Sequence, residues 1–317
     1  MKIGVDIMGG DHAPKETVAG SVLARRELPE EVELVLIGDE AAIRAELSGL
    51  GEKAEHYSIV HAPSVIEMGD HPTKAFQQKP DSSIVVGFQL LKDGKIDCFA
   101  SAGNTGAMLV GSMFSVKPIP GIARPAIATL LPKVNGGWGL LLDVGVNADC
   151  KPEMLVQFAT LGTIYAKHIL HIEQPSVGLM SIGEEEEKGN LLVKETHGLL
   201  KEARDIRFVG NVEGRDLFND KADVIVCDGF TGNVMLKEAE SFYYIIRKRG
   251  IDDAYFNRFN YEDYGGTPVL GVNGNVIIAH GISKAKAIRS MVMLSHEVVE
   301  ARLSDRIASA FSKETVS

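Results

Sequence analysis

The chain has 317 residues, of which 45% are apolar and 24% are charged. This composition is typical of a globular protein, and it excludes a disordered, collagen-like or coiled-coil chain. The 33 basic and 43 acidic side chains give a formal net charge of −10 at pH 7. An acidic surface repels phosphate backbones, so we do not expect nucleic acid as a general partner.

The predicted elements alternate between short runs rich in Val, Ile and Leu and longer stretches with helical period. This pattern is typical of parallel strands joined by crossover helices. The clearest helices are Pro152–Ile169 and Ser283–Leu303. The predicted strands, in chain order, are Lys2–Asp6, Glu33–Gly38, Ser58–His61, Asp97–Ser101, Ala126–Leu131, Trp138–Asp143, Ser176–Ser181, Arg207–Gly210, Val224–Asp228 and Val276–Ala279.

We therefore expect an α/β fold with three α/β/α layers around a mostly parallel sheet. Composition reveals no internal hinge, so residues 1–317 are expected to form one large unit, with or without two subdomains around a cleft. Residues 240–264 are the exception to the alternation. There, aromatic side chains and a basic cluster, followed directly by Gly265 and Gly266, predict a protruding segment.

The cysteines and the N-terminus indicate a cytoplasmic protein. Cys98, Cys150 and Cys227 are odd in number and have no CxxC spacing, which supports neither a disulfide framework nor a zinc ribbon. Asp6 and Gly9 interrupt the first apolar run, so it cannot serve as a secretory signal. No run of 18 apolar residues occurs, so any membrane association is expected to be peripheral.

Five predicted strands run into loops of one kind, made of glycine and short polar side chains before a helix start. In a parallel sheet the carboxyl ends of the strands share one edge, so these loops are expected to converge at a ligand crevice. Close backbone approach at glycine and the N-terminal ends of helices suit an anion, above all phosphate. The loops are Asp6–His12, Ser101–Gly106, Asp143–Asp149, Asp228–Asn233 and Ala279–Gly281.

Each loop also has a purely structural interpretation, because the same residue types cap helices and make tight turns. No GxxxxGK[ST] and no strand-borne GxGxxG occurs, so neither ATP nor NAD is expected. His12, His280 and Lys188 are candidates for contact with a ligand, and the alternative for each is an ordinary loop or surface side chain. Asn190 is positioned to cap the helix that follows it.

The three strand-end aspartates Asp6, Asp143 and Asp228 are candidates for metal ligands or bases, but no metal-site motif accompanies them. No GxSxG motif occurs, and no cysteine is adjacent in sequence to a histidine, so a covalent nucleophile is not expected. We predict neither a cofactor nor a metal. A bound anion is then itself the candidate nucleophile.

Six blocks in this order resemble the PlsX family, the phosphate acyltransferases of bacterial phospholipid synthesis. They are VDIMGGDHAP, FASAGNTGA, LLLDVGVNADCKPE, GNVEGRD, VCDGFTGNVMLK, and YGG with VIIAHG. The resemblance implies transfer of a fatty acyl group from acyl carrier protein (ACP) to inorganic phosphate, giving acyl phosphate and free ACP. It further implies a homodimer, peripheral membrane contact, and a fold similar to phosphotransacetylases and isocitrate/isopropylmalate dehydrogenases.

The motif residues give the candidate site. The catalytic candidates, whose polar side chains are suited to stabilising an oxyanion or moving a proton, are His12, Asn104, Lys188 and Asn233. The candidates for binding phosphate or acyl group are Gly10, Asp11, Ser101, Gly103, Thr105, Gly106, Asp143, Asn147, Asn190, Asp228, Thr231 and His280. The helix after Gly106, with Met108, is a candidate acyl surface, and ordinary core packing is its alternative.

Between Val234 and Tyr264 the chain looks shorter than members of this family. Within that stretch, Arg247–Arg249 forms the densest cationic run, which suits acidic ACP, anionic lipid or a solvated helix end. An alternative function is a phosphotransacetylase-like enzyme that uses short acyl-CoA. Non-catalytic binding and a decarboxylating dehydrogenase are further alternatives.

Overall fold

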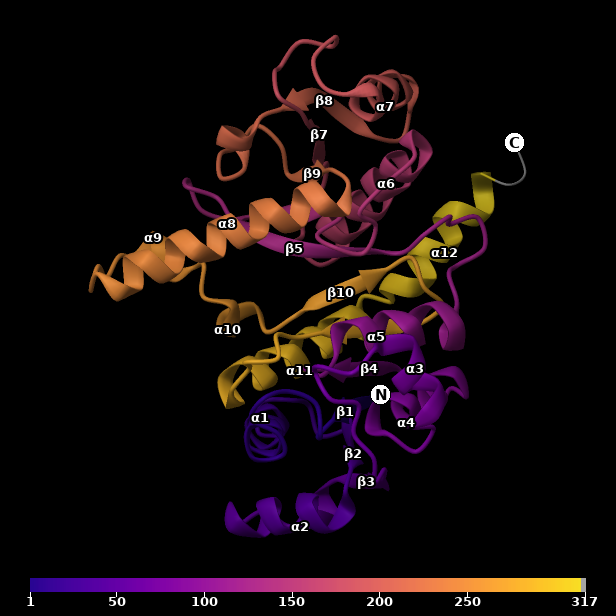
Figure 1. Ribbon diagram of the computed structural model, residues 1–317, viewed down its shortest axis with the longest axis vertical. Coiled ribbons are helices and arrows are strands. Elements are labelled where there is room, and N and C mark those ends of the chain that lie inside the picture. Colours follow the sequence, from indigo (N-terminus) through magenta and orange to yellow (C-terminus); the bar gives the residue numbers. More distant parts are fainter. Residues whose placement is uncertain (315–317) are drawn as a thin grey trace. The chain divides into compact units, whose positions relative to one another are not determined.

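The computed structural model describes residues 1–314, which form two compact units. Unit 1 comprises residues 1–119 and 261–304, and unit 2 comprises residues 120–260 and 305 onward. Figure 1 shows their helices and strands and labels most of them. No helix in the described part of the chain combines the length and the apolarity needed to span a membrane.

Unit 1 is built on six strands in the spatial order β3-β2-β1-β4-β11-β10. All neighbours are parallel except the antiparallel pair β10 and β11. Its strands are β1 (Lys2–Asp6), β2 (Glu33–Gly38), β3 (Ser58–His61), β4 (Cys98–Ser101), β10 (Thr267–Leu270) and β11 (Asn275–Ile278). Its helices of at least four residues are α1 (Lys15–Arg25), α2 (Glu40–Gly49), α3 (Pro72–Gln78), α4 (Ser83–Lys92), α5 (Thr105–Gly111), the π-helical turn Ser112–Val116, α10 (Tyr261–Tyr264) and α11 (Ala285–Glu300).

The central strands of unit 1 are buried on both faces, as parallel strands covered by helices must be. In β1, the four consecutive residues from Ile3 to Asp6 are all buried, so both faces of the strand are covered. Helix α11 packs on β4 and β11, and it also contacts α1. That contact is close because Gly20 has no side chain: a Cβ there would lie 2.5 Å from Cβ of Ile288.

Unit 2 contains five strands in the order β5-β6-β9-β7-β8. The pair β5 and β6 is antiparallel and the other pairs are parallel. Its strands are β5 (Ala126–Pro132), β6 (Trp138–Leu142), β7 (Ser176–Met180), β8 (Arg207–Val212) and β9 (Val224–Val226). Its helices are α6 (Pro152–His168), α7 (Leu191–Glu202), α8 (Gly229–Lys248), α9 (Ala254–Asn257) and α12 (Leu303–Glu314), whose first two residues fall in unit 1.

The predicted α/β class with a mostly parallel sheet is confirmed, and so are all ten predicted strands to within two residues at each end. Strand β10 escaped prediction because it is short and contains Pro268, which sequence rules place outside a strand. The predicted helix Ser283–Leu303 was wrong in its extent. Arg302 has φ +51°, which ends α11 and lets α12 start in a new direction.

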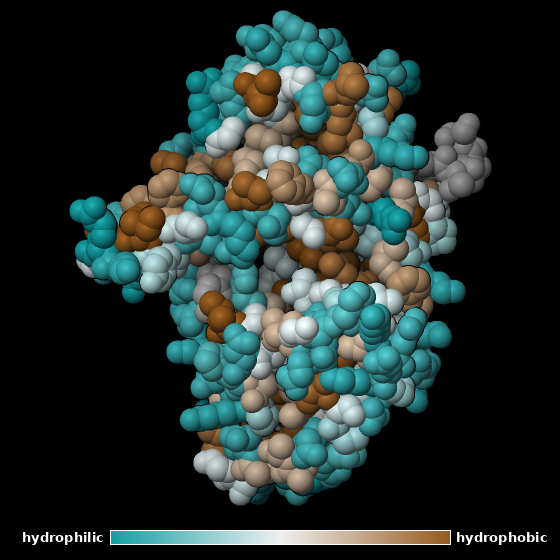
Figure 2. Space-filling view, viewed as in Figure 1, coloured by the Kyte–Doolittle hydropathy of each residue, from teal (hydrophilic) through white to brown (hydrophobic). Residues whose placement is uncertain are grey.

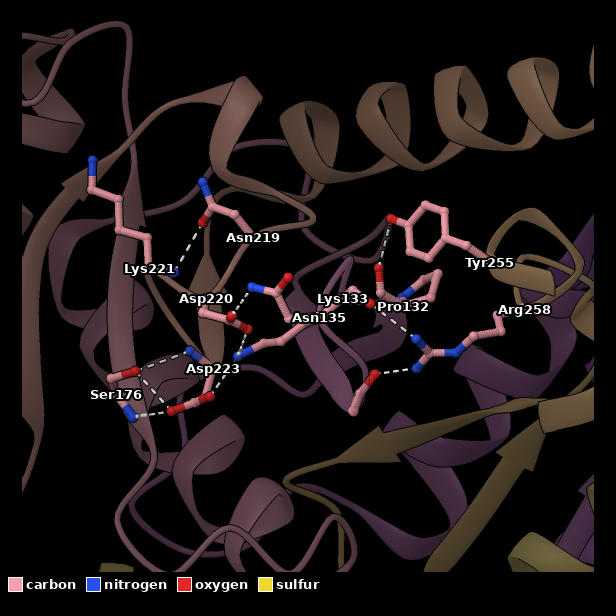
Figure 3. Close-up of polar contacts among 11 residues, drawn as sticks. Pro132, Lys133, Asn135, Ser176, Asn219, Asp220, Lys221, Asp223, Tyr255 and Arg258 are labelled. Carbon is pink, nitrogen blue, oxygen red and sulfur yellow. Dashed lines mark hydrogen bonds and ion pairs between the residues drawn. The ribbon is translucent and has the colours of Figure 1, made fainter. Parts of the chain in front are cut away.

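Residues 249–260 are tied to the β5–β6 hairpin within unit 2. The Tyr255 hydroxyl donates to the carbonyl of Pro132 at 3.0 Å, and Arg258 donates to the carbonyls of Lys133 and Gly137. The Arg258 guanidinium also lies over the ring of Trp138, 4.5 Å from its centre. Figure 3 shows the side chains of Tyr255 and Arg258 pointing toward the hairpin.

A partly buried ion pair lies on the other side of the same view. Lys133, whose side chain is 8% exposed, donates to Asp223 at 2.6 Å, and Asp223 also accepts from the hydroxyl and backbone N–H of Ser176 (Figure 3). Burial by itself would raise the pKa of Asp223, but these bonds outweigh it and lower the pKa below its ordinary value. The pair joins the starts of β7 and β9 to the end of β5.

Lys133→Met would leave the Asp223 carboxylate without its cation. Because the folded pKa is lowered, the pair stabilises the fold above the ordinary carboxyl pKa of about 4, and this contribution disappears as the pH falls through the lowered value. We expect a loss of about 3 kcal/mol in unfolding free energy at pH 7, shrinking below pH 4, in urea titrations. Lys201→Met, which removes an exposed pair with Glu186, should cost under about 1 kcal/mol. Equal losses in the two variants would contradict this account.

Candidate functional site

In unit 1, three of the five predicted loops come together. They follow β1, β4 and β11, which are adjacent and parallel. The N–H of Asp11 donates to the carbonyl of Gly281 at 2.8 Å. A Cβ on Gly9 would lie 2.7 Å from the amide nitrogen of Gly103, so the first two loops touch through backbone alone. The predicted convergence is confirmed for these loops.

A buried carboxyl ties the loops after β1 and β4 together. The Ser101 hydroxyl donates to Asp6 at 2.6 Å and accepts from the N–H of Gly103 at 2.9 Å. Asp6 has no solvent exposure, and this burial raises its pKa, although hydrogen bonds from Ser101, Ser83 and the N–H of Met8 counteract the effect. Asp6 and Ser101 thus form the base of the loop cluster.

Asn104 is also committed to the fold. Its side-chain oxygen caps α5 by accepting from the N–H of Ala107 at 3.0 Å. Its amide nitrogen lies 3.0–3.2 Å from the carbonyl oxygens of Glu67, Met68 and Asp70. The side chain therefore positions the loop before α3, and this geometry favours a positioning role over contact with a ligand.

The exposed candidates of unit 1 are Asp11, His12 and Thr105, while Gly10, Gly106 and His280 are half-buried. Gly10 has φ +105°, a conformation that favours glycine. A Cβ on Gly106 would lie 2.3 Å from Cγ of Pro72, so this glycine is required for α3 to pack on α5. Met108, the candidate acyl contact, has no solvent exposure and belongs to the core.

In unit 2, the loops after β6 and β9 meet around Asp143. This buried carboxylate accepts from the N–H groups of Ile127, Gly145, Val146 and Asn147 and from the side-chain amide of Asn147. Burial raises the pKa of Asp143, and the bonds from Asn147 oppose the increase. The N–H of Gly229 donates to the carbonyl of Asn147 at 2.7 Å, which joins the two loops.

Three other polar candidates of unit 2 also have structural partners. Asp228 caps α8 by accepting from the N–H and the hydroxyl of Thr231. Asn233 donates to the carbonyl of Val144 at 3.1 Å, and Asn190 caps α7 through the N–H of Val193. Lys188 is exposed in the loop before α7, next to Gly189 with φ +102°.

Two cavities open at this loop cluster of unit 2, with volumes of about 670 and 630 Å³. Both are lined by Asn190, Leu192, Asp228 and Thr231, so they share a wall. The second is lined mainly by apolar side chains from α6, β7, α7 and α8. Sequence reasoning missed this cavity because the acidic run after β7 indicated only a solvated loop, and the apolar positions of α7 and α8 had no distinguishing pattern.

Neither metal chemistry nor a reactive thiol finds support in the described residues. Within residues 1–314 no three His, Cys, Asp or Glu side chains form a group that could hold a metal ion. Cys98 and Cys227 are buried, and burial raises the pKa of the half-buried Cys150 thiol to about 12. A thiol with that pKa is almost wholly protonated at neutral pH.

Solved structures similar to this one define the class of fold. A phosphotransacetylase from Streptococcus pyogenes matches with a TM-score of 0.69 at 18% identity, over 95% of this chain and 94% of its own. A 4-hydroxythreonine-4-phosphate dehydrogenase from Klebsiella pneumoniae matches with a TM-score of 0.58 at 13% identity, over 94% and 98%. The expected phosphotransacetylase-like and dehydrogenase-like fold is thereby confirmed.

Sequence comparison is more specific. Residues 1–306 match the model of the family described as fatty acid synthesis protein. A phosphate acyltransferase from Pelotomaculum thermopropionicum is 46% identical over 98% of this chain and 95% of its own length. One from Dictyoglomus turgidum is 43% identical over 99% of both chains. The chain belongs to this fatty acid synthesis family of enzymes, which confirms the resemblance seen in its sequence.

The role of Asn104 is open to a stability test. Asn104→Ala removes both the cap of α5 and the donor to three carbonyls, so we expect a loss of about 2 kcal/mol in unfolding free energy. Asn190→Ala, which removes an exposed cap of α7 alone, should cost at most about 1 kcal/mol. Thermal or urea unfolding of both variants measures the difference. A smaller loss for Asn104→Ala than for Asn190→Ala would overturn the positioning role.

Proposed function

We propose that this enzyme transfers a fatty acyl group from acyl-ACP to inorganic phosphate, giving acyl phosphate for phospholipid synthesis. The observation that carries the proposal is the 46% identity with a phosphate acyltransferase over 98% of this chain. In this reaction a phosphate oxygen attacks the thioester carbonyl carbon. The carbon–sulfur bond then breaks, and the ACP thiolate leaves and takes up a proton.

The chemistry of the described side chains is compatible with direct attack by phosphate. The cysteine pKa values are raised, so the thiols are poor nucleophiles, and the protein's contribution is to orient phosphate and stabilise the oxyanion. For unit 1 we propose His12 as the side chain that acts on the reactants, because it is exposed beside the converging loops. For unit 2 we propose Lys188, an exposed cation before α7. Asn104, Asn233 and the buried Ser101 and Asp143 would position the loops, and the remaining candidates would bind phosphate or the acyl group.

His12→Asn and Lys188→Met test these roles. Loss of one stabilising donor typically lowers kcat about 10²–10³-fold, and we expect this without loss of stability because both side chains are exposed. Phosphate-dependent release of ACP thiol, with mass spectrometry of acyl phosphate, measures the rate. A lost limb in the pH–rate profile of His12→Asn would indicate acid–base work, whereas a rise confined to the phosphate KM would indicate binding.

The matched controls are His56→Asn and Lys194→Met, both exposed and outside the loop clusters. If a site variant keeps the rate of its control, that side chain has no part in the reaction. The same assay with acyl-ACP and short acyl-CoA donors separates the proposed function from a phosphotransacetylase-like one. Failure of every donor would contradict both.

We also propose that ACP docks at the C-terminal end of α8, where Arg247, Lys248 and Arg249 are all exposed. Lys248 lies 5.9 Å from the ring centre of Tyr244, so the cluster combines positive charge with an aromatic surface. Such a patch steers an acidic partner even though the net charge of the chain is negative. Peripheral contact with anionic lipid is the competing use of the same cluster.

Reversal of all three charges to Glu should raise the KM for acyl-ACP about tenfold and weaken its salt dependence. Reversal of Lys194, Lys201 and Arg204 makes the same charge change on another exposed surface of unit 2 and should leave the KM within about twofold. Liposome flotation of both variants measures the lipid alternative. Loss of flotation with an unchanged KM would assign the cluster to lipid, and no effect in either assay would leave it solvated.

A homodimer is the remaining proposal, supported by apolar side chains on the surface of α8. Phe242, Tyr244 and Ile245 are 58%, 65% and 50% exposed. Figure 2 has the same view as Figure 1, and it shows brown, hydrophobic residues among teal, hydrophilic ones on the left, where Figure 1 labels α8. Exposed apolar patches of this kind mark protein or membrane contacts. Sedimentation of the wild-type chain reports directly on the dimer.

A further inference from the structure

The two cavities of unit 2 differ in chemical character although they share a wall. Apart from the shared wall, the first, of about 670 Å³, is bordered by Asp149 and Cys150 and by the apolar side chains of Ala148, Leu191 and Phe230. The second, of about 630 Å³, is bordered by the apolar side chains Leu155, Met180 and Met235. Both volumes lie in the range of about 300–1,000 Å³ that is usual for small-molecule sites. A ligand that fills both would place an apolar tail in the second cavity and a group of mixed polarity in the first.

The charged side chains that line these cavities disfavour phosphate there. Among the described residues that line them there is no Lys, Arg or His. The charged groups are instead the carboxylates of Asp149 and Asp228, which repel an anion. Asp228 is further engaged by the N–H and hydroxyl of Thr231. The shared wall therefore suits a neutral group, such as a thioester or the start of an alkyl chain.

One polar atom in the wall of the second cavity has no hydrogen-bond partner in the described structure. The Ser181 hydroxyl oxygen is buried and makes no hydrogen bond with any described group, and Ser181 lines this cavity at the end of β7. A buried hydroxyl without a partner costs free energy unless a ligand or water satisfies it. If the Ser181 side chain rotates toward the cavity, an acyl carbonyl oxygen would be a suitable acceptor.

We propose that the second cavity holds the acyl chain of the donor, and that the chain enters past Leu192, which lines both cavities. The inference rests on the proposed function and names the place of its hydrophobic substrate. The tail would lie among side chains of α6, β7, α7 and α8. Figure 1 shows where these four elements lie in unit 2. The size of this cavity then limits the length of the chain that the enzyme accepts.

Leu192→Trp, which fills the shared wall, tests the assignment. Burial of each methylene is worth about 0.8 kcal/mol, or about fourfold in kcat/KM. If the indole displaces about three methylenes, the preference for a 16-carbon over an 8-carbon acyl-ACP falls roughly 60-fold. Leu199→Trp is the matched control, because Leu199 lies on the same helix, is 38% exposed and lies outside both cavity linings. It should keep the wild-type chain preference.

Met235→Ala enlarges the second cavity instead of filling it. This variant still tests the assignment if Leu192→Trp fails to fold. The enlarged cavity should shift the preference toward longer chains. A readout besides activity is photocrosslinking of the full wild-type chain with a fatty acid carrying a diazirine near its terminal carbon. Crosslinks should map to peptides containing Leu155, Met180 or Met235.

The outcomes separate the inference from the function on which it rests. If the wild type forms no acyl phosphate from any donor, the proposed function fails. If the wild type is active but the chain preferences of Met235→Ala and every folded variant at Leu192 equal those of the wild type, the cavity assignment is overturned. Crosslinks outside the cavity walls would overturn it as well.

Discussion

The buried carboxylate of Asp143 is the constraint on which the functional edge of unit 2 depends. It sits directly after β6 and gathers four backbone N–H groups and one side-chain amide. Its own carbonyl lies so close to α8 that a Cβ on Gly232 would approach within 2.0 Å of that oxygen. The start of α8, and with it the cap at Asp228 and the shared wall of the two cavities, is fixed by this packing. In unit 1 the buried carboxyl of Asp6, together with Ser101, likewise joins two strand-end loops, although it accepts fewer hydrogen bonds.

Much of the fold could be predicted because burial on both faces leaves a plain signal in the sequence. The first three strands have the predicted bounds, since runs such as those of β1 and β2 are continuously apolar and end at a polar residue or glycine. The break between α11 and α12 could not be predicted, because a left-handed Arg302 has no reliable signature in a single sequence. The sequence predicted that all five strand-end loops converge at one crevice, and the structure confirms the meeting of three of them within unit 1 and of two within unit 2.

The roles of individual side chains in those loops were harder to predict. Asn104, Asn190 and Asp228 are capping residues in the structure, and the same residue types would serve a ligand equally well. Only coordinates reveal whether an amide faces a carbonyl of its own chain or an open cavity. The sequence likewise offered no means to separate the apolar side chains that line the second cavity from those of the core, because helical period records burial and not the shape of the space enclosed.

The contact between Arg258 and Trp138 has an optical consequence. Trp138 is the one tryptophan of the chain, and the guanidinium above its ring belongs to the segment that follows α8. Indole emission responds to charge and water near the ring, so the native fluorescence of the unlabelled protein is a local signal for the attachment of residues 249–260 to the β5–β6 hairpin. Any partner that engages the end of α8 and pulls this segment away would change the colour of the emission without an added dye.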